Sequence, residues 1–160
     1  RMEIIGQPTG IVVRTASGEA FSSKAANVVQ NIIKPSLNTG KVSYDALRMW
    51  HSEKSATGWV SLELLFPFTV ELTGIGIHTQ HSGKYHAAET VRISTRTKGG
   101  EYSLVKESRL RSVDERVNFT FFKAQYLKLD LKAGSSGYVV VRGLQFFSGS
   151  VEIFTPLIPC

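Results

Sequence analysis

The chain has 160 residues, of which 42% are hydrophobic and 20% charged, so it can build one well-buried core but is short for two. Its formal charge of +6 favours anionic partners, but Lys and Arg are scattered and no recognition motif accompanies them, which argues against a nucleic-acid partner. No stretch approaches the roughly 20 apolar residues that span a bilayer, and the start lacks the regions of a signal peptide. We therefore expect a single domain over residues 1–160, whose export signal has been removed if it is exported.

The first part of the chain reads as short strands separated by polar segments. Residues 11–14 are apolar and β-branched, and residues 15–19 carry a turn signal. Residues 22–33 fit either a short helix or a strand, which Pro35 ends. Between residues 36 and 57 we expect a long loop with one aromatic anchor, Trp50. Residues 58–66 then alternate, with the purely apolar set facing the core: Val60, Leu62, Leu64 and Phe66.

Two alternating strands with a polar loop between them dominate the middle of the chain. We expect the strands over Thr69–Ile77 and Thr90–Thr97, after a break at Pro67. The loop between them, residues 78–89, holds three of the four histidines. Because loops carried by rigid strands commonly hold binding residues, this loop is the first candidate for function.

The remaining sequence also consists of short predicted strands with loops between them. Further strands are predicted over residues 102–105, 116–121, 124–131, 138–147 and 151–154, with a flexible loop over residues 134–137. Roughly eight to ten strands at intervals of about 8–12 residues, with almost no helical periodicity, predict an all-β antiparallel sandwich or barrel. The one cysteine, Cys160, has no partner in the chain, so the core must form without a disulfide.

Several short motifs, in this order and spacing, resemble the discoidin (coagulation factor 5/8 type C) domains and the related galactose-binding-like carbohydrate-binding modules. The early motifs are Ala25–Asn27, Met49–Ser52, Trp59–Leu64 and Val70–Ile77. The later ones are Val91–Thr95 with Gly99 and Gly100, then Ala124–Leu129 and Val140–Phe147. The resemblance covers residues 21–149, and each motif is unspecific when taken alone.

The resemblance implies a jelly-roll β-sandwich of about eight core strands whose loops at one end bind a ligand. In the sugar-binding relatives, this site combines a ring-stacking aromatic residue with His, Arg and Asn side chains that bond sugar hydroxyls. Residues 78–86 occupy the corresponding loop, and their imidazole, amide and hydroxyl groups offer both donors and acceptors. Tyr85 is the candidate for stacking, while Lys84 stands in for the usual Arg as a non-planar substitute, which leaves the identity of the sugar open.

The candidate ligand-binding residues come from this loop and from the segment around Trp50. They are Tyr44, Arg48, His51, His78, Gln80, His81, Lys84, Tyr85 and His86. Trp50 itself is expected in the core, which turns His51 the other way by strand alternation. Arg142 is expected to be structural, with its charge paired at a sheet edge.

Metal and cofactor sites are weighed against the same residues. The loop histidines could ligate zinc, but no nearby Cys or acidic pattern supports a closed site. The family often carries a structural calcium held in part by an acid near the last strand, where this chain has Gly143 and Gln145, so calcium is doubtful. We expect no cofactor.

The sequence carries none of the usual catalytic signatures, such as a G-x-S-x-G elbow, a phosphate loop or H-E-x-x-H, so we expect a binding module and not an enzyme. The first hypothesis is a lectin-like module for a sugar, possibly of galactose type, within a larger polypeptide or a homo-oligomer that adds avidity. The alternative is an adhesion module that binds anionic phospholipid or a protein partner. We expect a location outside the cell or at its surface. An intracellular interaction domain of the same fold is a third possibility, which the lack of disulfides fits.

Overall fold

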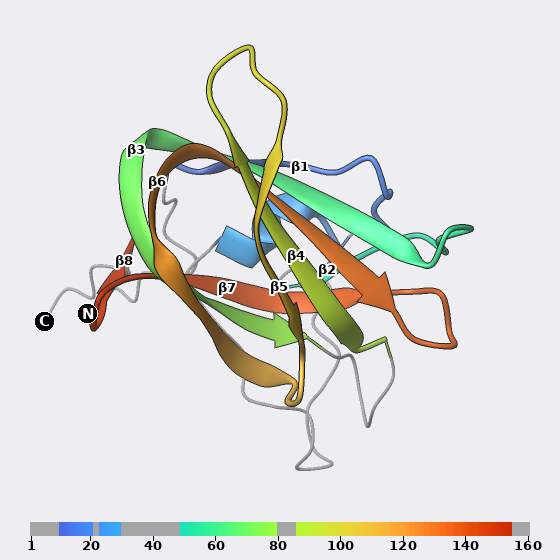
Figure 1. Ribbon diagram of the computed structural model, residues 1–160. Helices are drawn as coiled ribbons and strands as arrows, with labels where there is room; N and C mark the ends of the chain where they lie inside the picture. Colours follow the sequence, from blue (N-terminus) through green and yellow to red (C-terminus); the bar gives the residue numbers. More distant parts are fainter. Residues whose placement is uncertain (1–9, 21–22, 30–48, 80–85, 155–160) are drawn as a thin grey trace, which may run out of the picture.

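The computed structural model describes residues 10–20, 23–29, 49–79 and 86–154, and within these ranges it consists of eight strands and one 3₁₀ helix (Figure 1). The first elements are β1 (Val12–Arg14), the 3₁₀ helix η1 (Ala25–Val29), β2 (Trp50–His51) and β3 (Trp59–Thr79). The later strands are β4 (Ala88–Arg96), β5 (Ser103–Arg109), β6 (Asp114–Ala133), β7 (Val140–Ser148) and β8 (Val151–Ile153). No helix in these ranges is long and apolar enough to cross a membrane.

All strand pairs are antiparallel, and the two long strands β3 and β6 belong to both layers of the fold. The first half of β3 pairs with β1 and with the second half of β6, which in turn pairs with β4, and β4 pairs with β5. The second half of β3 pairs with the first half of β6 and with β7, which carries β2 and β8. The bend of β3 and β6 seen in Figure 1 therefore folds one continuous sheet over on itself. The predicted antiparallel sandwich is confirmed.

The bend explains why two predicted pairs of strands are single strands. Pro67 was expected to separate two strands, yet β3 continues through it. The register between β3 and β6 shifts between Leu65 and Val70. Proline has no N–H to donate, so a strand tolerates it where such an irregularity interrupts the ladder. The strands predicted over residues 116–121 and 124–131 are likewise joined in β6.

The core lies between the two layers and is built by strand alternation. Val60, Leu62, Leu64 and Phe66 all point inward and are at most 2% exposed, as the sequence predicts. The ambiguous segment 22–33 contains η1, whose buried face packs into the same cluster as Trp50. Trp50 is fully buried, which confirms its place in the core.

Candidate functional site

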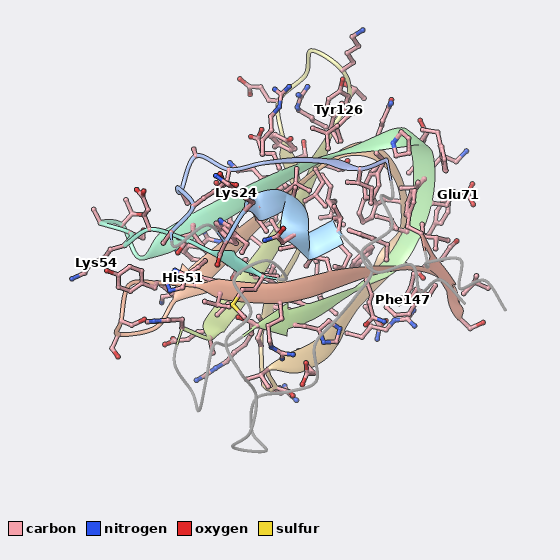
Figure 2. The ribbon with its side chains drawn as sticks, turned by 180° about the vertical axis from the view of Figure 1, so that it is seen from behind. Lys24, His51, Lys54, Glu71, Tyr126 and Phe147 are labelled. Carbon is pink, nitrogen blue, oxygen red and sulfur yellow. The ribbon has the colours of Figure 1, made fainter. Side chains whose placement is uncertain are left out.

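A hollow of about 360 Å³ opens at the end of the sandwich where β2 and the start of β7 meet the connecting segments. Its described lining consists of Ala20, His51, Glu53, Lys54, His86 and Tyr138. Figure 2 shows His51 and Lys54 together at one side of the molecule, with Glu71 and Phe147 at the other. Residues from four separate segments of the chain thus meet at one end.

Three rings form one wall of the hollow. The centroids of His51 and His86 lie 5.1 Å apart, those of His86 and Tyr138 also 5.1 Å, and those of His51 and Tyr138 5.5 Å. All three pairs meet edge to face, which is a favourable arrangement for aromatic rings. The cluster therefore combines an apolar surface with the polar atoms of two imidazoles and a phenol.

Glu53 and Lys54 form the rim of the hollow, and both are exposed. Neither the carboxylate nor the ammonium group makes a hydrogen bond or an ion pair with a described residue. Each side chain lies against a glycine in the left-handed region, Glu53 against Gly18 (φ 76°) and Lys54 against Gly137 (φ 79°). A Cβ on Gly18 would come within 2.5 Å of Glu53, so this position requires glycine.

Backbone hydrogen bonds hold the two sides of the hollow together. The N–H of Ser52 donates to the carbonyl of Val139 (3.0 Å), and the Ser52 hydroxyl accepts from the N–H of Val139 (2.9 Å). The N–H of Ser55 donates to the carbonyl of Gly137 (2.8 Å). β2 and the segment before β7 are thus tied together beneath the rings.

Local contacts also orient the two imidazoles. Nδ1 of His51 lies 2.7 Å from the carbonyl oxygen of Ser52, which can only accept, so this ring nitrogen carries the proton. Nδ1 of His86 lies 3.0 Å from the hydroxyl of Ser136. The backbone of His86 is in the left-handed region (φ 61°), a conformation that non-glycine residues adopt at a cost of about 1–2 kcal/mol. Such strain is often found at functional sites.

The structure brings together two of the residues predicted from the sequence, His51 and His86, and separates them from a third. His78 does not line the hollow, and it belongs to β3 and not to the loop in which the sequence placed it. The strand continues because His78 and Thr79 still pair with β7. The other candidates, Tyr44, Arg48, Gln80, His81, Lys84 and Tyr85, lie outside the described residues and stay predictions.

Sequence reasoning missed four of the described lining residues, namely Ala20, Glu53, Lys54 and Tyr138. Tyr138 was assigned to a strand, but it directly follows the glycine-rich loop of residues 134–137 and precedes β7. A residue at such a loop–strand junction is exposed to the same end of the sandwich as the loop, which is the signal that could have found it. Glu53 and Lys54 follow β2 in the same way.

His78 is part of a polar network that connects β3 with its two neighbours, β6 and β7. Its Nδ1 lies 2.7 Å from Oδ1 of Asp114, and its Nε2 lies 2.7 Å from Oε1 of Gln145, whose amide in turn donates to Glu152. The fully buried Arg142 donates from Nη2 to the same Oδ1 of Asp114 (2.6 Å). The predicted pairing of the Arg142 charge is confirmed, but β7 lies between β2 and β3, so the residue is in the sheet interior and not at an edge.

Acid is expected to destabilise the fold through Asp114. Burial raises the pKa of this carboxyl group, but hydrogen bonds from His78 and Arg142 outweigh burial and hold the pKa below its ordinary value of 3.8. The unfolded chain therefore takes up the proton first as the pH falls. The stabilisation is complete above the unfolded-state pKa and is lost as the pH drops through the folded-state pKa.

Urea unfolding of the wild type and of Asp114→Asn near neutral pH and near pH 3 measures this contribution. We expect the wild type to be the more stable protein near neutral pH and the difference to narrow in acid. A constant difference at both pH values would contradict the assignment.

The described residues contain no group of three or more His, Cys, Asp or Glu side chains that could hold a metal ion. Of the three histidines weighed as zinc ligands, His78 is engaged by Asp114 and Gln145, His86 lines the hollow, and His81 lies outside the described residues. Where the family's calcium-binding acid was sought, Gln145 is engaged by His78 and Glu152. The polar groups of the described lining are the two imidazoles, the phenol of Tyr138, the carboxylate of Glu53 and the ammonium group of Lys54.

Comparison with known proteins shows which solved structures share this fold. No protein-family model and no curated protein matches the chain. CpGH89CBM32-5 from Clostridium perfringens, solved with GalNAc-β-1,3-galactose, matches with a TM-score of 0.66 and 16% identity, over 88% of this chain and 98% of that one. The family 32 module of NanJ from C. perfringens, solved with galactose, has a TM-score of 0.64 and 18% identity, over 92% and 100% of the two chains.

A third similar structure comes from another bacterium. Chitosan-binding module 2 of the chitosanase/glucanase from Paenibacillus sp. IK-5, solved with chitotriose, matches with a TM-score of 0.66 and 11% identity, over 87% and 97% of the two chains. Together these similarities show that the chain has the β-sandwich fold of family 32 carbohydrate-binding modules. The resemblance noted in the sequence is confirmed at the level of the fold.

Proposed function

We propose that the protein is a non-catalytic, lectin-like module that binds a sugar in the hollow formed by His51, Glu53, Lys54, His86 and Tyr138. The observation that carries the proposal is the combination of an aromatic wall with an unpaired carboxylate and an unpaired ammonium group on the rim. A pyranose presents apolar C–H faces as well as hydroxyl groups. The hollow offers a surface for each of them.

The roles of the side chains follow from their chemistry. The ring of Tyr138 would pack against a C–H face of the sugar, and His86 would bond a hydroxyl group beside it. The carboxylate of Glu53 would accept hydrogen bonds from hydroxyl groups, and Lys54 would donate to them. Such charge-assisted hydrogen bonds contribute about 1.5–3 kcal/mol each.

Galactose-type sugars are the first ligands to consider. The structures similar to this chain were solved with galactose, GalNAc-β-1,3-galactose and chitotriose. Two neighbouring hydroxyl groups of such a sugar can bind one carboxylate and one ammonium group at the same time. Glu53 and Lys54 provide one group of each kind on the rim. The loop residues Tyr85, His81 and Lys84 remain candidates for completing the site.

Anionic phospholipid, the alternative ligand, would need exposed apolar side chains at the loop tips with basic residues beneath them. The described lining of the hollow contains no large aliphatic residue and no Phe. Among the residues that the structure describes, the large exposed apolar ones are Val12, Phe68, Leu104, Phe121 and Val151, and none of them lines the hollow. The polar character of this end therefore favours sugar over lipid.

The setting proposed for the module is extracellular or at a cell surface. One shallow site of this size binds a sugar weakly, and attachment to a larger polypeptide or assembly into a homo-oligomer would raise the effective affinity. We propose such a multivalent context together with the function.

A glycan-array screen, followed by calorimetry on the best hit, tests the proposal. We expect Tyr138→Ala to weaken binding about tenfold, because it removes the stacking ring. Glu53→Gln should weaken binding by about tenfold to a hundredfold, because it removes a charged acceptor. The matched control is Glu71→Gln, an exposed carboxylate on the far side of the molecule (Figure 2), which should leave the affinity unchanged.

The outcomes separate the ligand classes. Absence of binding to any glycan would overturn the sugar proposal, and anionic vesicles would then be the next ligand to test. Binding that survives both Tyr138→Ala and Glu53→Gln, with native circular dichroism, would move the site away from this hollow.

A further inference from the structure

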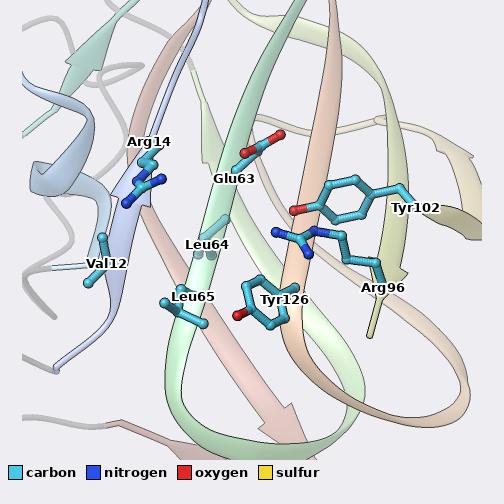
Figure 3. A pocket seen from close by; sticks show the side chains of 8 residues that line it. All are labelled: Val12, Arg14, Glu63, Leu64, Leu65, Arg96, Tyr102 and Tyr126. Carbon is cyan, nitrogen blue, oxygen red and sulfur yellow. The ribbon is translucent and has the colours of Figure 1, made fainter. Parts of the chain in front are cut away.

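A second hollow, of about 230 Å³, lies on the outer face of the layer formed by β1, β3, β6 and β4. Its polar lining consists of Arg14, Glu63, Arg96, Tyr102 and Tyr126 (Figure 3). In Figure 2, Tyr126 lies at the top of the molecule, well away from His51 at its side. This hollow is therefore separate from the one at the loop end and shares no described residue with it.

Arg96 is held between two aromatic rings. Its guanidinium carbon lies 4.0 Å from the ring centroid of Tyr126 and 5.3 Å from that of Tyr102. Its one hydrogen bond to a described residue runs from Nη1 to the carbonyl of Thr97 (3.3 Å), and no described carboxylate pairs with it. Figure 3 shows the guanidinium group between the rings, with Glu63 on β3, which β6 separates from the strand of Arg96. The rings restrict a group that is otherwise ready to bind an anion.

Arg14 adds a second unpaired guanidinium group across the hollow. It faces Glu63 in the register of β1 and β3, yet it makes no ion pair with any described carboxylate. Lys128 lies nearby, with Nζ 5.7 Å from the ring centroid of Tyr102. Glu63 is the one acid in the described lining, so positive charge prevails there. Planar guanidinium groups suit bidentate recognition of a carboxylate or sulfate oxygen pair.

The remaining groups match a hydroxylated ligand and not a bare anion. The hydroxyl groups of Tyr102 and Tyr126 make no hydrogen bond to a described residue, and neither does the carboxylate of Glu63. Glu63 would repel a small anion but accepts hydrogen bonds from hydroxyl groups. Leu65 and the half-exposed Val12 supply an apolar floor.

We propose that this face hollow binds an anionic sugar residue of an acidic polysaccharide, with Arg96 and Arg14 on the acidic group and Glu63 on the hydroxyl groups. The acidic group is a carboxylate or a sulfate ester. The net charge of +6 attracts such a polymer to the protein. The inference stands independently of the function proposed for the loop hollow.

Calorimetry with a trigalacturonate, a heparin tetrasaccharide and a neutral galactan trisaccharide tests the inference on the full chain. We expect at least one acidic probe to bind about tenfold or more tightly than the neutral one, and the difference to shrink as salt is raised. Preference for trigalacturonate, whose only acidic groups are carboxylates, identifies a carboxylate ligand, and preference for the heparin probe, which carries sulfate groups beside its carboxylates, indicates that sulfate is recognised. Equal binding of acidic and neutral probes would overturn the inference.

Variants locate the site. Arg96→Gln and Arg14→Gln should each weaken binding of the acidic probe by about tenfold to a hundredfold. Arg111→Gln is the matched control. Arg111 is exposed and lies outside the hollow, and its variant loses the same positive charge. The Arg14 side chain makes no hydrogen bond or ion pair with a described residue, so its variant remains informative if Arg96→Gln unfolds.

Variants in the loop hollow distinguish this inference from the proposed function. Tyr138→Ala should leave binding of the acidic probe unchanged. If Tyr138→Ala abolishes that binding while Arg14→Gln and Arg96→Gln do not affect it, the acidic sugar binds at the loop end, and the face site is refuted while the proposed function stands.

Discussion

Replacing Asp114 by Ala is expected to lower the free energy of unfolding by about 3 kcal/mol. The side chain of Arg142 is 0% exposed, and its Nη2 donates to Asp114 as well as to the carbonyls of Thr79 (3.1 Å) and Val113 (3.2 Å). Removing Asp114 takes away the ion pair that this buried guanidinium group makes with β6. The two carbonyls still accept hydrogen bonds, which keeps the loss at the lower end of the range for a broken buried pair.

Asp130 provides a matched control for this prediction. Asp114 and Asp130 both lie on β6, and their side chains are 33% and 27% exposed. They differ in their partners, since Lys128 is 31% exposed and lies 3.7 Å from Asp130. We expect Asp130→Ala to cost less than about 1 kcal/mol.

A double variant separates the lost pair from lost packing. Asp114→Ala combined with Arg142→Met removes both charges, and it should recover part of the stability lost in the single variant. Urea unfolding of all four proteins measures these differences. If Asp114→Ala and Asp130→Ala lower the free energy of unfolding equally, the burial of Arg142 does not determine how much the Asp114–Arg142 ion pair contributes to stability.

The alternation of apolar residues was sufficient to predict the sandwich and its inward face. Val60, Leu62 and Leu64 point inward because a half-buried strand has a period of two, and this property is local to the sequence. The course of the chain at Pro67 was not predictable in the same way. Whether a strand ends or bends there depends on its partners, and β6 bends alongside β3.

The site was only partly predictable, because contacts between distant segments of the chain also determine which residues line it. His51 could be proposed because it follows a residue whose burial was evident, and His86 because it belongs to a polar loop. Tyr138 was missed, since its ring meets the two imidazoles only after β7 pairs with β2. His78 was placed in the loop because nothing in its own segment shows that Asp114 and Gln145 flank it in the sheet.

The second large effect is expected for the buried tryptophan. Trp50→Ala should lower the free energy of unfolding by about 3–5 kcal/mol, because it leaves a cavity in the core and removes a hydrogen bond. The indole is 0% exposed, and its Nε1 donates to the carbonyl of Gly18 (2.9 Å). Trp59→Ala should lower the free energy of unfolding by only about 1 kcal/mol, because Trp59 lies on the outer face of the sheet. There the guanidinium carbon of Arg92 lies over the Trp59 ring, 4.2 Å from the ring centroid.

A third variant keeps this prediction testable if Trp50→Ala does not fold. Trp50→Phe retains most of the ring and loses the hydrogen bond to Gly18, so about 2 kcal/mol should be lost. Denaturant unfolding measures the difference, and the emission of the remaining Trp59 reports a half-buried indole in the native state. Because Gly18 lies against Glu53 at the rim, the Phe variant should also weaken sugar binding. Unchanged sugar binding in Trp50→Phe, together with the expected loss of stability, would refute this connection between the core and the rim.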